Sequence, residues 1–286
     1  MAFIALVILG HEMKANKIAL ITGATGGMGL VTAKLLADNG WVVFAADNNV
    51  EALERIENHA GIVPIFIDVS QRSSVEQAFK EYSQKYQHLD AIINFAGILR
   101  VGSISEMKEA DLEQLLNINV LGTFRVNQVF IPLLKKSTKG RIINISSETG
   151  WQSGGPFNGA YAMSKHAIEA YSDSLRRELM LINIPVIKIQ PGPFKTDMVK
   201  SIEMSFSKAI ESTVDFKAPL TKTKELALKE QVKAHSPAII ARTVLAALNA
   251  NKPKTSYSVK ADLARTLLEY FPAAWADWVL KKVLAS

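Results

Sequence analysis

A tyrosine and a lysine four residues apart are the pair of side chains in this 286-residue sequence that most clearly suggests proton transfer. Tyr161 and Lys165 would share one face of a helix. A free tyrosine titrates near about pKa 10, too high for a base at neutral pH, but a neighbouring ammonium favours the phenolate and lowers that pKa. Alone, such a pair is more often an ordinary surface contact. Its place shortly after an apolar run that leads to Ser147 favours a chemical role.

A glycine-rich segment from Gly23 to Gly29 follows the first apolar run, Ile18–Thr22, and precedes a helical stretch. Glycines let the backbone approach a pyrophosphate closely, and the N-terminus of a helix offers unpaired N–H groups to it. A glycine cluster alone can also be only a tight turn. Its position between a strand and a helix indicates a dinucleotide site.

Asp47 ends the second apolar run and could select between dinucleotides. A carboxylate there accepts hydrogen bonds from both ribose hydroxyls of NAD and repels the 2′-phosphate of NADP. Asn48 and Asn49 follow it, and the glycine-rich segment contains no Lys or Arg. Asp47 could also simply cap a helix, which is compatible with this role. We expect NAD as the cofactor, rather than NADP.

Apolar, β-branched runs alternate with amphipathic stretches along the chain, which predicts an α/β fold with a doubly wound parallel sheet of the Rossmann type. We expect about seven strands in a single domain of residues 14–286, after an N-terminal extension of residues 1–13. The predicted strands are Ile18–Thr22, Trp41–Ala46, Ile62–Ile67, Leu89–Asn94, Arg141–Ser146, Pro185–Gln190 and a short Thr255–Val259.

Composition and the N-terminal residues exclude several classes of protein. The chain has no cysteine, which rules out disulfides, thiolate metal sites and a cysteine nucleophile. Its net charge of +6 is dispersed, so we expect no nucleic-acid partner. Met1–Leu9 is too short to span a bilayer and lacks the features of a signal peptide. We expect Met13 to be the natural start and the protein to be cytoplasmic, with peripheral membrane contact as an open alternative.

Taken in order, the motifs resemble the short-chain dehydrogenase/reductase family over roughly residues 16–260. Phe95 stands where the family has a second Asn, and we expect it to change packing under the cofactor without removing catalysis. The separation of Ser147 and Tyr161 is slightly longer than the family pattern. The matching motifs are Thr22-Gly23 through Gly27 and Gly29, Asp68-Val69, Asn94-Phe95-Ala96-Gly97, Asn119-Val120-Leu121-Gly122, Ile145-Ser146-Ser147, Tyr161 through Lys165, and Pro191-Gly192 through Thr196.

The resemblance implies four catalytic residues. Tyr161 exchanges a proton with the substrate oxygen, and Ser147, with Ser146 as its rival, holds that oxygen. Lys165 binds the nicotinamide ribose and, together with the positive charge of the nicotinamide, lowers the pKa of Tyr161, while Asn119 holds a water that relays protons. We expect no metal, because the histidines lack ligand spacing. The expected cofactor-binding residues are Gly23, Thr25, Gly27, Met28, Gly29, Asp47, Asp68, Val69, Asn94, Ala96, Gly97, Tyr161, Lys165, Pro191, Gly192 and Thr196.

The substrate is suggested by apolar residues around the predicted site. The mixed polar and apolar segment 197–235 predicts a lid or substrate loop. Together these residues favour a hydrophobic secondary alcohol, such as a steroid, retinoid or other lipid-like molecule, and its carbonyl. A reductase of acyl-thioester ketones or a general carbonyl reductase is the alternative, and a non-catalytic NAD(H) sensor is a third reading. The candidate substrate contacts are Trp151, Gln152, Phe157 and Met198.

The C-terminal residues 261–284 predict helices with an apolar stripe of Trp275, Trp278 and Val279 close to Lys281 and Lys282. Such a stripe is more often buried in the fold or in a dimer, but it also suits a helix lying on a membrane surface. The family resemblance implies a homodimer or homotetramer that contacts through helices around 110–136 and 157–182.

Overall fold

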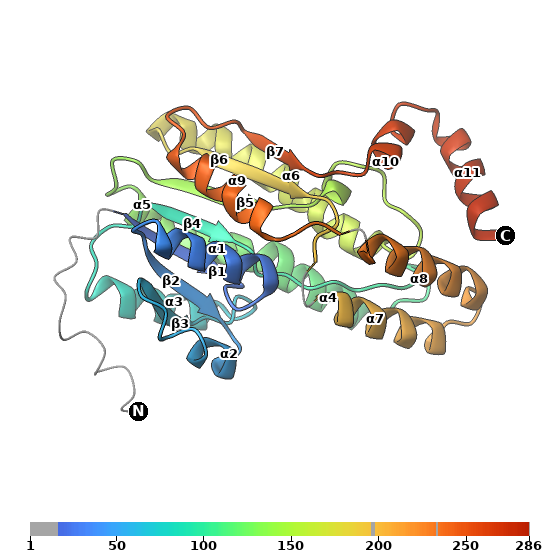
Figure 1. The fold of residues 1–286 in the computed structure, drawn as a ribbon, viewed down its shortest axis with the longest axis horizontal. Helices are drawn as coiled ribbons and strands as arrows, with labels where there is room; N and C mark the ends of the chain where they lie inside the picture. The colour runs from blue at the N-terminus through green and yellow to red at the C-terminus, as the bar shows by residue number, and fades with distance from the viewer. Residues whose placement is uncertain (1–16, 196–197, 233, 286) are drawn as a thin grey trace.

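The computed structural model describes residues 17–195, 198–232 and 234–285 and shows the predicted Rossmann-type α/β fold (Figure 1). Seven parallel strands form one sheet in the order β3-β2-β1-β4-β5-β6-β7, with helices on both faces. The predicted strands are confirmed to within two residues at each end. They are β1 (Ile18–Thr22), β2 (Val42–Asp47), β3 (Ile62–Phe66), β4 (Ala91–Asn94), β5 (Arg141–Ile145), β6 (Val186–Pro191) and β7 (Ser256–Val259).

The central strands are apolar on both faces because both faces are covered. In β1, Ala19 and Ile21 belong to one hydrophobic core, whereas Ile18 and Leu20 belong to another on the opposite side of the sheet. All five residues of β1 are buried. Alternate side chains of a strand point to opposite faces, so a strand between two helical layers reads as a continuous apolar run.

The helices form two layers around the sheet. Side chains of α1 (Gly27–Asp38), α2 (Val50–Glu54 and the turn after it) and α9 (Ala238–Asn249) contribute to the first core or pack against it. The second core is completed by α3 (Arg72–Ser83), α5 (Thr123–Leu134) and α6 (Gly159–Leu179). The α9 helix begins directly after Pro237, its N-cap residue.

A π-helical segment, η1 (Asn117–Gly122), joins α4 (Glu109–Leu116) to α5 and was not predicted. Each π-turn inserts an extra residue into a helix, and such segments occur frequently at functional sites. It places Asn119 in the interior, where it is buried.

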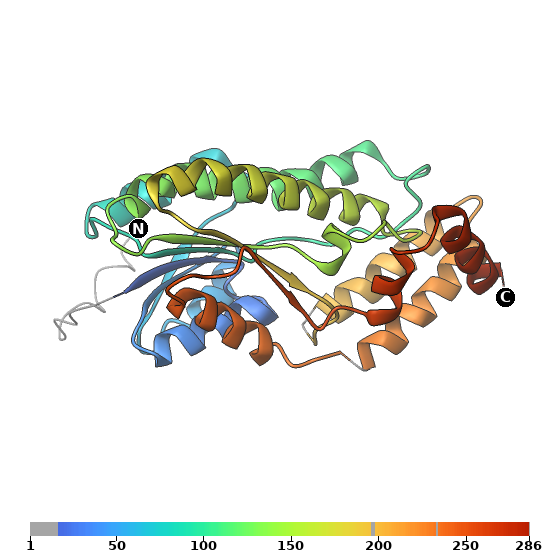
Figure 2. The ribbon, with the colours of Figure 1, turned by 90° about the horizontal axis from the view of Figure 1, so that it is seen from above.

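Four helices lie beyond the sheet, at the end where the C-terminus is found (Figures 1 and 2). Residues 198–232, within the predicted lid, form α7 (Met198–Ser212) and α8 (Lys217–Val232), which pack against each other. The predicted C-terminal helices are α10 (Leu263–Leu268) and α11 (Ala273–Ala285), and α11 contacts α8. Two short 3-10 helices, η2 (Glu148–Gly150) and η3 (Met180–Ile182), flank α6.

Within the ranges that the structure describes, no helix combines the length and the apolar character needed to cross a bilayer. The expectation that Met13 is the natural start concerns residues 1–13, which lie outside the described residues.

Arg141 at the start of β5 ties the sheet to the C-terminal end of α9. Its guanidinium is buried and donates to the carbonyls of Ala247, at 2.7 Å, and Ala250, at 3.0 Å. Replacing it by methionine in Arg141→Met leaves both carbonyls without this donor. We expect the free energy of unfolding to fall by about 2 kcal/mol in urea titration.

The matched control for this substitution is Arg72→Met, which removes an exposed ion pair with Glu76 at 2.8 Å. We expect it to change the free energy of unfolding by less than about 0.5 kcal/mol. Equal losses in the two variants would contradict this role of Arg141.

Candidate active site

A pocket of about 630 Å³ lies where the glycine-rich segment meets the residues that follow β2, β3 and β4. Ten of the predicted cofactor-binding residues line it: Gly23, Thr25, Gly27, Met28, Gly29, Asp47, Asp68, Val69, Ala96 and Gly97. Phe95, which we expected under the cofactor, also lines it. The other lining residues lie outside the predicted set: Gly26, Asn48, Asn49, Ile67, Ile98, Leu99, Arg100, Ile118 and Ser205. Ser205 comes from α7, so the predicted lid segment reaches this pocket.

The glycine-rich segment packs so closely that side chains are excluded from two of its positions. Gly23 has a φ of 65°, and a Cβ there would lie 2.7 Å from the backbone nitrogen of Ala96. A Cβ on Gly29 would lie 2.1 Å from the carbonyl oxygen of Gly23. The first amides of α1 have no partner within the helix, and in the described structure no side chain caps this end. The loop therefore fits the pyrophosphate of a dinucleotide.

Asp47, the last residue of β2, lies against this loop. Its Oδ2 accepts from the backbone N–H of Thr25 at 3.1 Å, and its Oδ1 accepts from that of Asn49 at 3.2 Å. These bonds hold a carboxylate in the pocket wall, at the carboxyl end of the sheet. In folds of this type, that is the position that meets the ribose of a dinucleotide.

Three of the predicted catalytic side chains gather beyond the end of β5. The Nζ of Lys165 donates to the carbonyl of Ile145 at 2.9 Å and lies 5.6 Å from the centre of the Tyr161 ring. Ser147 follows β5 by two residues and is hydrogen-bonded to the hydroxyl of Tyr161. The β5 strand and α6 thus bring a hydroxyl pair and an ammonium together.

Burial shifts the pKa of both titratable groups in this cluster. It raises the pKa of Tyr161 to about 12, an effect that the Ser147 hydrogen bond opposes and the charge of Glu148 increases. It lowers the pKa of Lys165 to about 8, against the effect of Glu169. In the chain without a cofactor, desolvation of the phenolate is the largest effect on the Tyr161 pKa. The expected lowering of this pKa by the Lys165 ammonium together with the positive charge of the nicotinamide concerns the cofactor-bound enzyme and stays a prediction. The chain alone keeps Tyr161 protonated at neutral pH.

Asn119, the fourth predicted catalytic residue, forms hydrogen bonds both to Ile98 in the wall of the pocket and to Ser164 of α6. Its Oδ1 accepts from the N–H of Ile98 at 2.8 Å, and its Nδ2 donates to the Ile98 carbonyl and to Ser164 Oγ, each at 3.0 Å. Its role in holding a water for proton relay stays a prediction.

The remaining predicted cofactor residues lie in different surroundings. Asn94 is buried, and its amide donates to Asn127 and Asn144 at 2.9 Å each, so its side chain belongs to a polar network in the core. Gly192 follows Pro191, the last residue of β6, and a Cβ there would lie 2.0 Å from the carbonyl oxygen of Lys260. Thr196 lies outside the described residues.

Of the four candidate substrate contacts, the three with described side chains have different surroundings. Trp151 is partly exposed, whereas Gln152 is buried and its amide donates to Thr266 of α10 at 3.2 Å. Phe157 packs edge-on against Phe216, with 5.7 Å between ring centres. The side chain of Met198 lies outside what the structure describes.

Sequence reasoning missed the polar contacts that α10 makes with residues 148–153, which are described below. Among the described residues, there is no group of three or more His, Asp and Glu side chains that could hold a metal ion.

Comparison with known proteins finds relatives that align with nearly the whole chain. Residues 17–205 match the family described as short chain dehydrogenase. A probable short-chain type dehydrogenase/reductase of Helicobacter pylori, VdlC, is 32% identical over 279 residues, covering 93% of this chain and 97% of the relative. The 3-oxoacyl-(acyl-carrier-protein) reductase FabG of Thermotoga maritima is 33% identical over 192 residues, covering 65% of this chain and 78% of the relative. A 3-ketodihydrosphingosine reductase of Bacteroides thetaiotaomicron is 32% identical over 189 residues, covering 66% and 68%.

Solved structures share the fold. A short-chain dehydrogenase of Streptomyces avermitilis superposes with a TM-score of 0.75 at 23% identity, covering 94% of this chain and 97% of that one. A variant of actinorhodin polyketide ketoreductase, solved with NADPH, gives a TM-score of 0.72 at 25% identity, covering 85% and 95%. On the family match and the whole-length relatives together, this chain belongs to the short-chain dehydrogenase/reductase family, a family of oxidoreductases that act on carbonyl and alcohol groups with a nicotinamide cofactor.

Proposed function

We propose that this protein is an NAD-dependent oxidoreductase that interconverts a hydrophobic secondary alcohol and its ketone. The observation that carries the proposal is the cluster of Ser147, Tyr161 and Lys165 at the carboxyl end of β5. The same edge of the sheet holds the pocket with the glycine-rich loop and the carboxylate of Asp47.

In this proposal the chain's residues bind, orient and exchange a proton. The amides at the start of α1 would hold the pyrophosphate and Asp47 the adenosine ribose. When bound, the nicotinamide ring supplies the hydride acceptor or donor. The hydroxyls of Ser147 and Tyr161 would both bond the substrate oxygen, and Tyr161 would give its proton to that oxygen or take it back. Lys165 keeps a positive charge close to the Tyr161 ring.

The choice of a hydrophobic substrate rests on aromatic side chains near the catalytic loop and on one relative. Phe157 and Trp151 lie between Ser147 and Tyr161 in the chain, and Phe157 packs against Phe216 in the predicted lid segment. The similarity to a 3-ketodihydrosphingosine reductase supports a lipid-like ketone. The similarity to a 3-oxoacyl-(acyl-carrier-protein) reductase favours a thioester ketone as the second candidate, so both classes belong in the substrate panel.

The first test is Tyr161→Phe, which removes the hydroxyl that exchanges the proton. We expect kcat to fall by at least about 1,000-fold with cofactor binding retained. The measurement is absorbance at 340 nm with NAD and hydroxysteroids, retinol, long-chain alcohols and hydroxyacyl thioesters. Tyr86→Phe is the matched control, because the Tyr86 ring packs on Phe44 and Tyr82, away from the pocket. Near-normal turnover by Tyr161→Phe would refute the assignment.

The second test concerns the choice of NAD over NADP. We expect the double variant Asp47→Ala with Asn48→Arg to raise the ratio of kcat/KM for NADP to that for NAD by at least about tenfold. The reason is that repulsion of the 2′-phosphate is removed and a cation is added next to it. Asp38→Ala, which removes an exposed carboxylate paired with His59, is the control. An unchanged ratio would show that Asp47 does not select the cofactor.

We also propose that the C-terminal helices contact an anionic lipid surface. The structure exposes apolar side chains there, and we call the following six the C-terminal apolar face: Leu263, Leu267, Tyr270, Phe271, Trp275 and Trp278. Trp275 and Trp278 are each 57% exposed, so they are not buried within the chain's own fold. Exposed Lys281 and Lys282 follow on α11, which suits negative headgroups.

For this contact we expect co-sedimentation with phosphatidylserine-containing vesicles that is lost in Trp275→Ser with Trp278→Ser. Phe66→Ser, at a half-exposed phenylalanine of the edge strand β3, is the control and should still bind. Light scattering of the same proteins tests the alternative that a second copy of the chain covers the C-terminal apolar face. If the wild-type protein is a dimer that the tryptophan substitutions dissociate, and if it does not bind vesicles, the lipid proposal is wrong. The C-terminal apolar face would then contact a second copy of the chain.

A further inference from the structure

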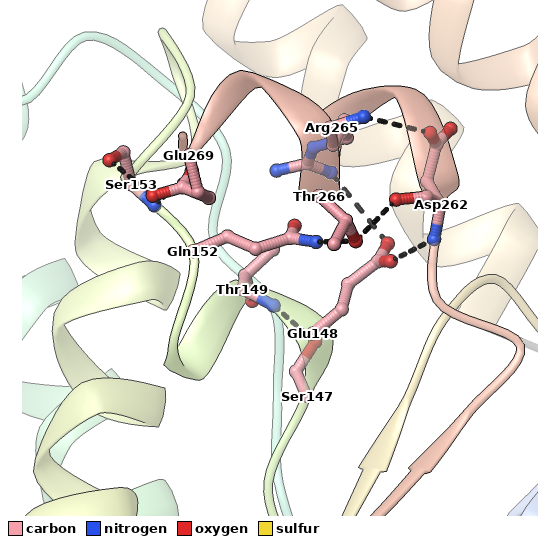
Figure 3. A network of polar contacts seen from close by, with 9 residues as sticks. All are labelled: Ser147, Glu148, Thr149, Gln152, Ser153, Asp262, Arg265, Thr266 and Glu269. Atoms are coloured by element: carbon pink, nitrogen blue, oxygen red, sulfur yellow. Dashed lines mark hydrogen bonds and ion pairs between the residues drawn. The ribbon is translucent and has the colours of Figure 1, made fainter. Parts of the chain in front are cut away.

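Residues 262–269, which we call the strap, lie against residues 147–153, which we call the serine loop (Figure 3). The strap consists of α10 with the residue on either side of it, and the serine loop begins at Ser147. Polar contacts tie the two together along their length. Asp262 N–H donates to Glu148 Oε2 at 2.7 Å, Gln152 Nε2 donates to Thr266 Oγ1 at 3.2 Å, and Ser153 N–H donates to Glu269 Oε1 at 2.8 Å.

Glu148, directly after Ser147, is the centre of these contacts. It is 7% exposed, and burial raises the pKa of its carboxyl, opposed by the Asp262 amide and the Arg265 charge. Arg265 Nη1 lies 3.7 Å from Glu148 Oε1. A buried carboxylate is costly unless it is paired and hydrogen-bonded, and both of these partners come from the strap.

Hydrogen bonds within the strap and at its far end hold the Asp262 amide and Arg265 in position near Glu148. Asp262 caps α10 by accepting from the N–H of Arg265 at 3.0 Å. Thr266 Oγ1 donates to the Asp262 carbonyl at 2.7 Å. At the other end, both carboxylate oxygens of Glu269 accept from Ser153, one from its N–H and one from its hydroxyl.

The serine loop is compact, so a displacement of Glu148 also displaces Ser147. Gly150 N–H donates to the Ser147 carbonyl at 3.0 Å, and Thr149 N–H to Ser147 Oγ at 3.3 Å. A Cβ on Gly150 would lie 2.5 Å from Ser146 Oγ and 3.0 Å from the Lys165 carbonyl, so the turn packs directly on β5 and α6. Because the turn is this compact, Ser147 and Glu148 shift together when its outer contacts are lost.

We propose that the strap positions Ser147 for catalysis and that Glu148 is the positioning residue that joins the two. This inference rests on the proposed function, because it concerns the same reaction. Glu148 and the strap residues are absent from the lining of the dinucleotide pocket described above. Loosening the strap therefore moves the Ser147 hydroxyl relative to Tyr161 and leaves the cofactor site as it is. The signature is a loss in kcat without a change in cofactor affinity.

The test uses the full-length protein with Glu148→Gln and Arg265→Met, alone and combined. We expect each single change to lower kcat about tenfold, with the Kd for NADH unchanged within about twofold. The combined variant should be no worse than the singles, because each removes the same contact. Arg265→Lys keeps the positive charge and should recover most of the rate. Arg72→Met, which removes an exposed ion pair on the surface of α3, should have wild-type kcat.

Hydrogen–deuterium exchange of residues 147–153 gives a readout that needs no substrate. We expect their amides to exchange at least about tenfold faster in Arg265→Met and in Glu269→Gln, and at the wild-type rate in Arg72→Met. Because Glu269 is exposed, Glu269→Gln tests the strap even where Glu148→Gln fails to fold.

The outcomes separate the two proposals. Wild-type kcat in Glu148→Gln, additive losses in the combined variant, or unchanged exchange in Arg265→Met would each overturn the strap. If the wild-type protein turns over nothing in the substrate panel, the proposed function fails, and the role of the strap in catalysis fails with it. Hydrogen–deuterium exchange would in that case report only whether the strap restrains the serine loop.

Discussion

Lys165 places a positive charge in the interior of the protein, and the geometry of the candidate site follows from how that charge is held. Its side chain is 8% exposed, and its ammonium donates to the carbonyl of Ile145, the last residue of β5. A buried ammonium without such an acceptor would be unstable, so this bond fixes the first turns of α6 against the sheet. Tyr161 lies one turn before Lys165 and is positioned with it. The same burial lowers the pKa of Lys165 to about 8, so position and electrostatics have one cause.

The parallel sheet explains why groups distant in sequence meet at this point. The strand order changes direction between β1 and β4, and loops that leave neighbouring strands toward opposite faces open a crevice there. The backbones of Gly23 and Ala96 approach so closely across this crevice that a side chain at Gly23 would collide with Ala96. Asp47 closes one end through its bond to Thr25, and the residues after β5 and in α6 supply the candidate catalytic cluster.

Most of the fold could be predicted because its signals are local, whereas much of the site's electrostatics could not. The central strand β1 is a continuous apolar run, and the glycine-rich segment is marked by its position between a strand and a helix. The π-turn at Asn119 interrupts no apolar pattern, so nothing in the sequence marked it. Gln152 looked like a substrate contact because it lies between Ser147 and Tyr161, yet its amide is bonded to Thr266, a residue far away in the chain. The raised pKa of Tyr161 depends on burial and on Glu148, which spacing alone cannot reveal.

The α10 helix shows why its contact with the serine loop escapes a search for hydrophobic periodicity. A helix on a globular protein usually turns its apolar side inward. Here Asp262, Thr266 and Glu269 contact the serine loop, while Leu263 and Leu267 are exposed. This helix is therefore attached through hydrogen bonds and one ion pair more than through apolar burial. Because a net hydrogen bond contributes only about 1 kcal/mol, a few polar contacts determine whether the strap stays on the loop. The candidate catalytic residue Ser147 is thus followed by a loop whose outer contacts are individually weak.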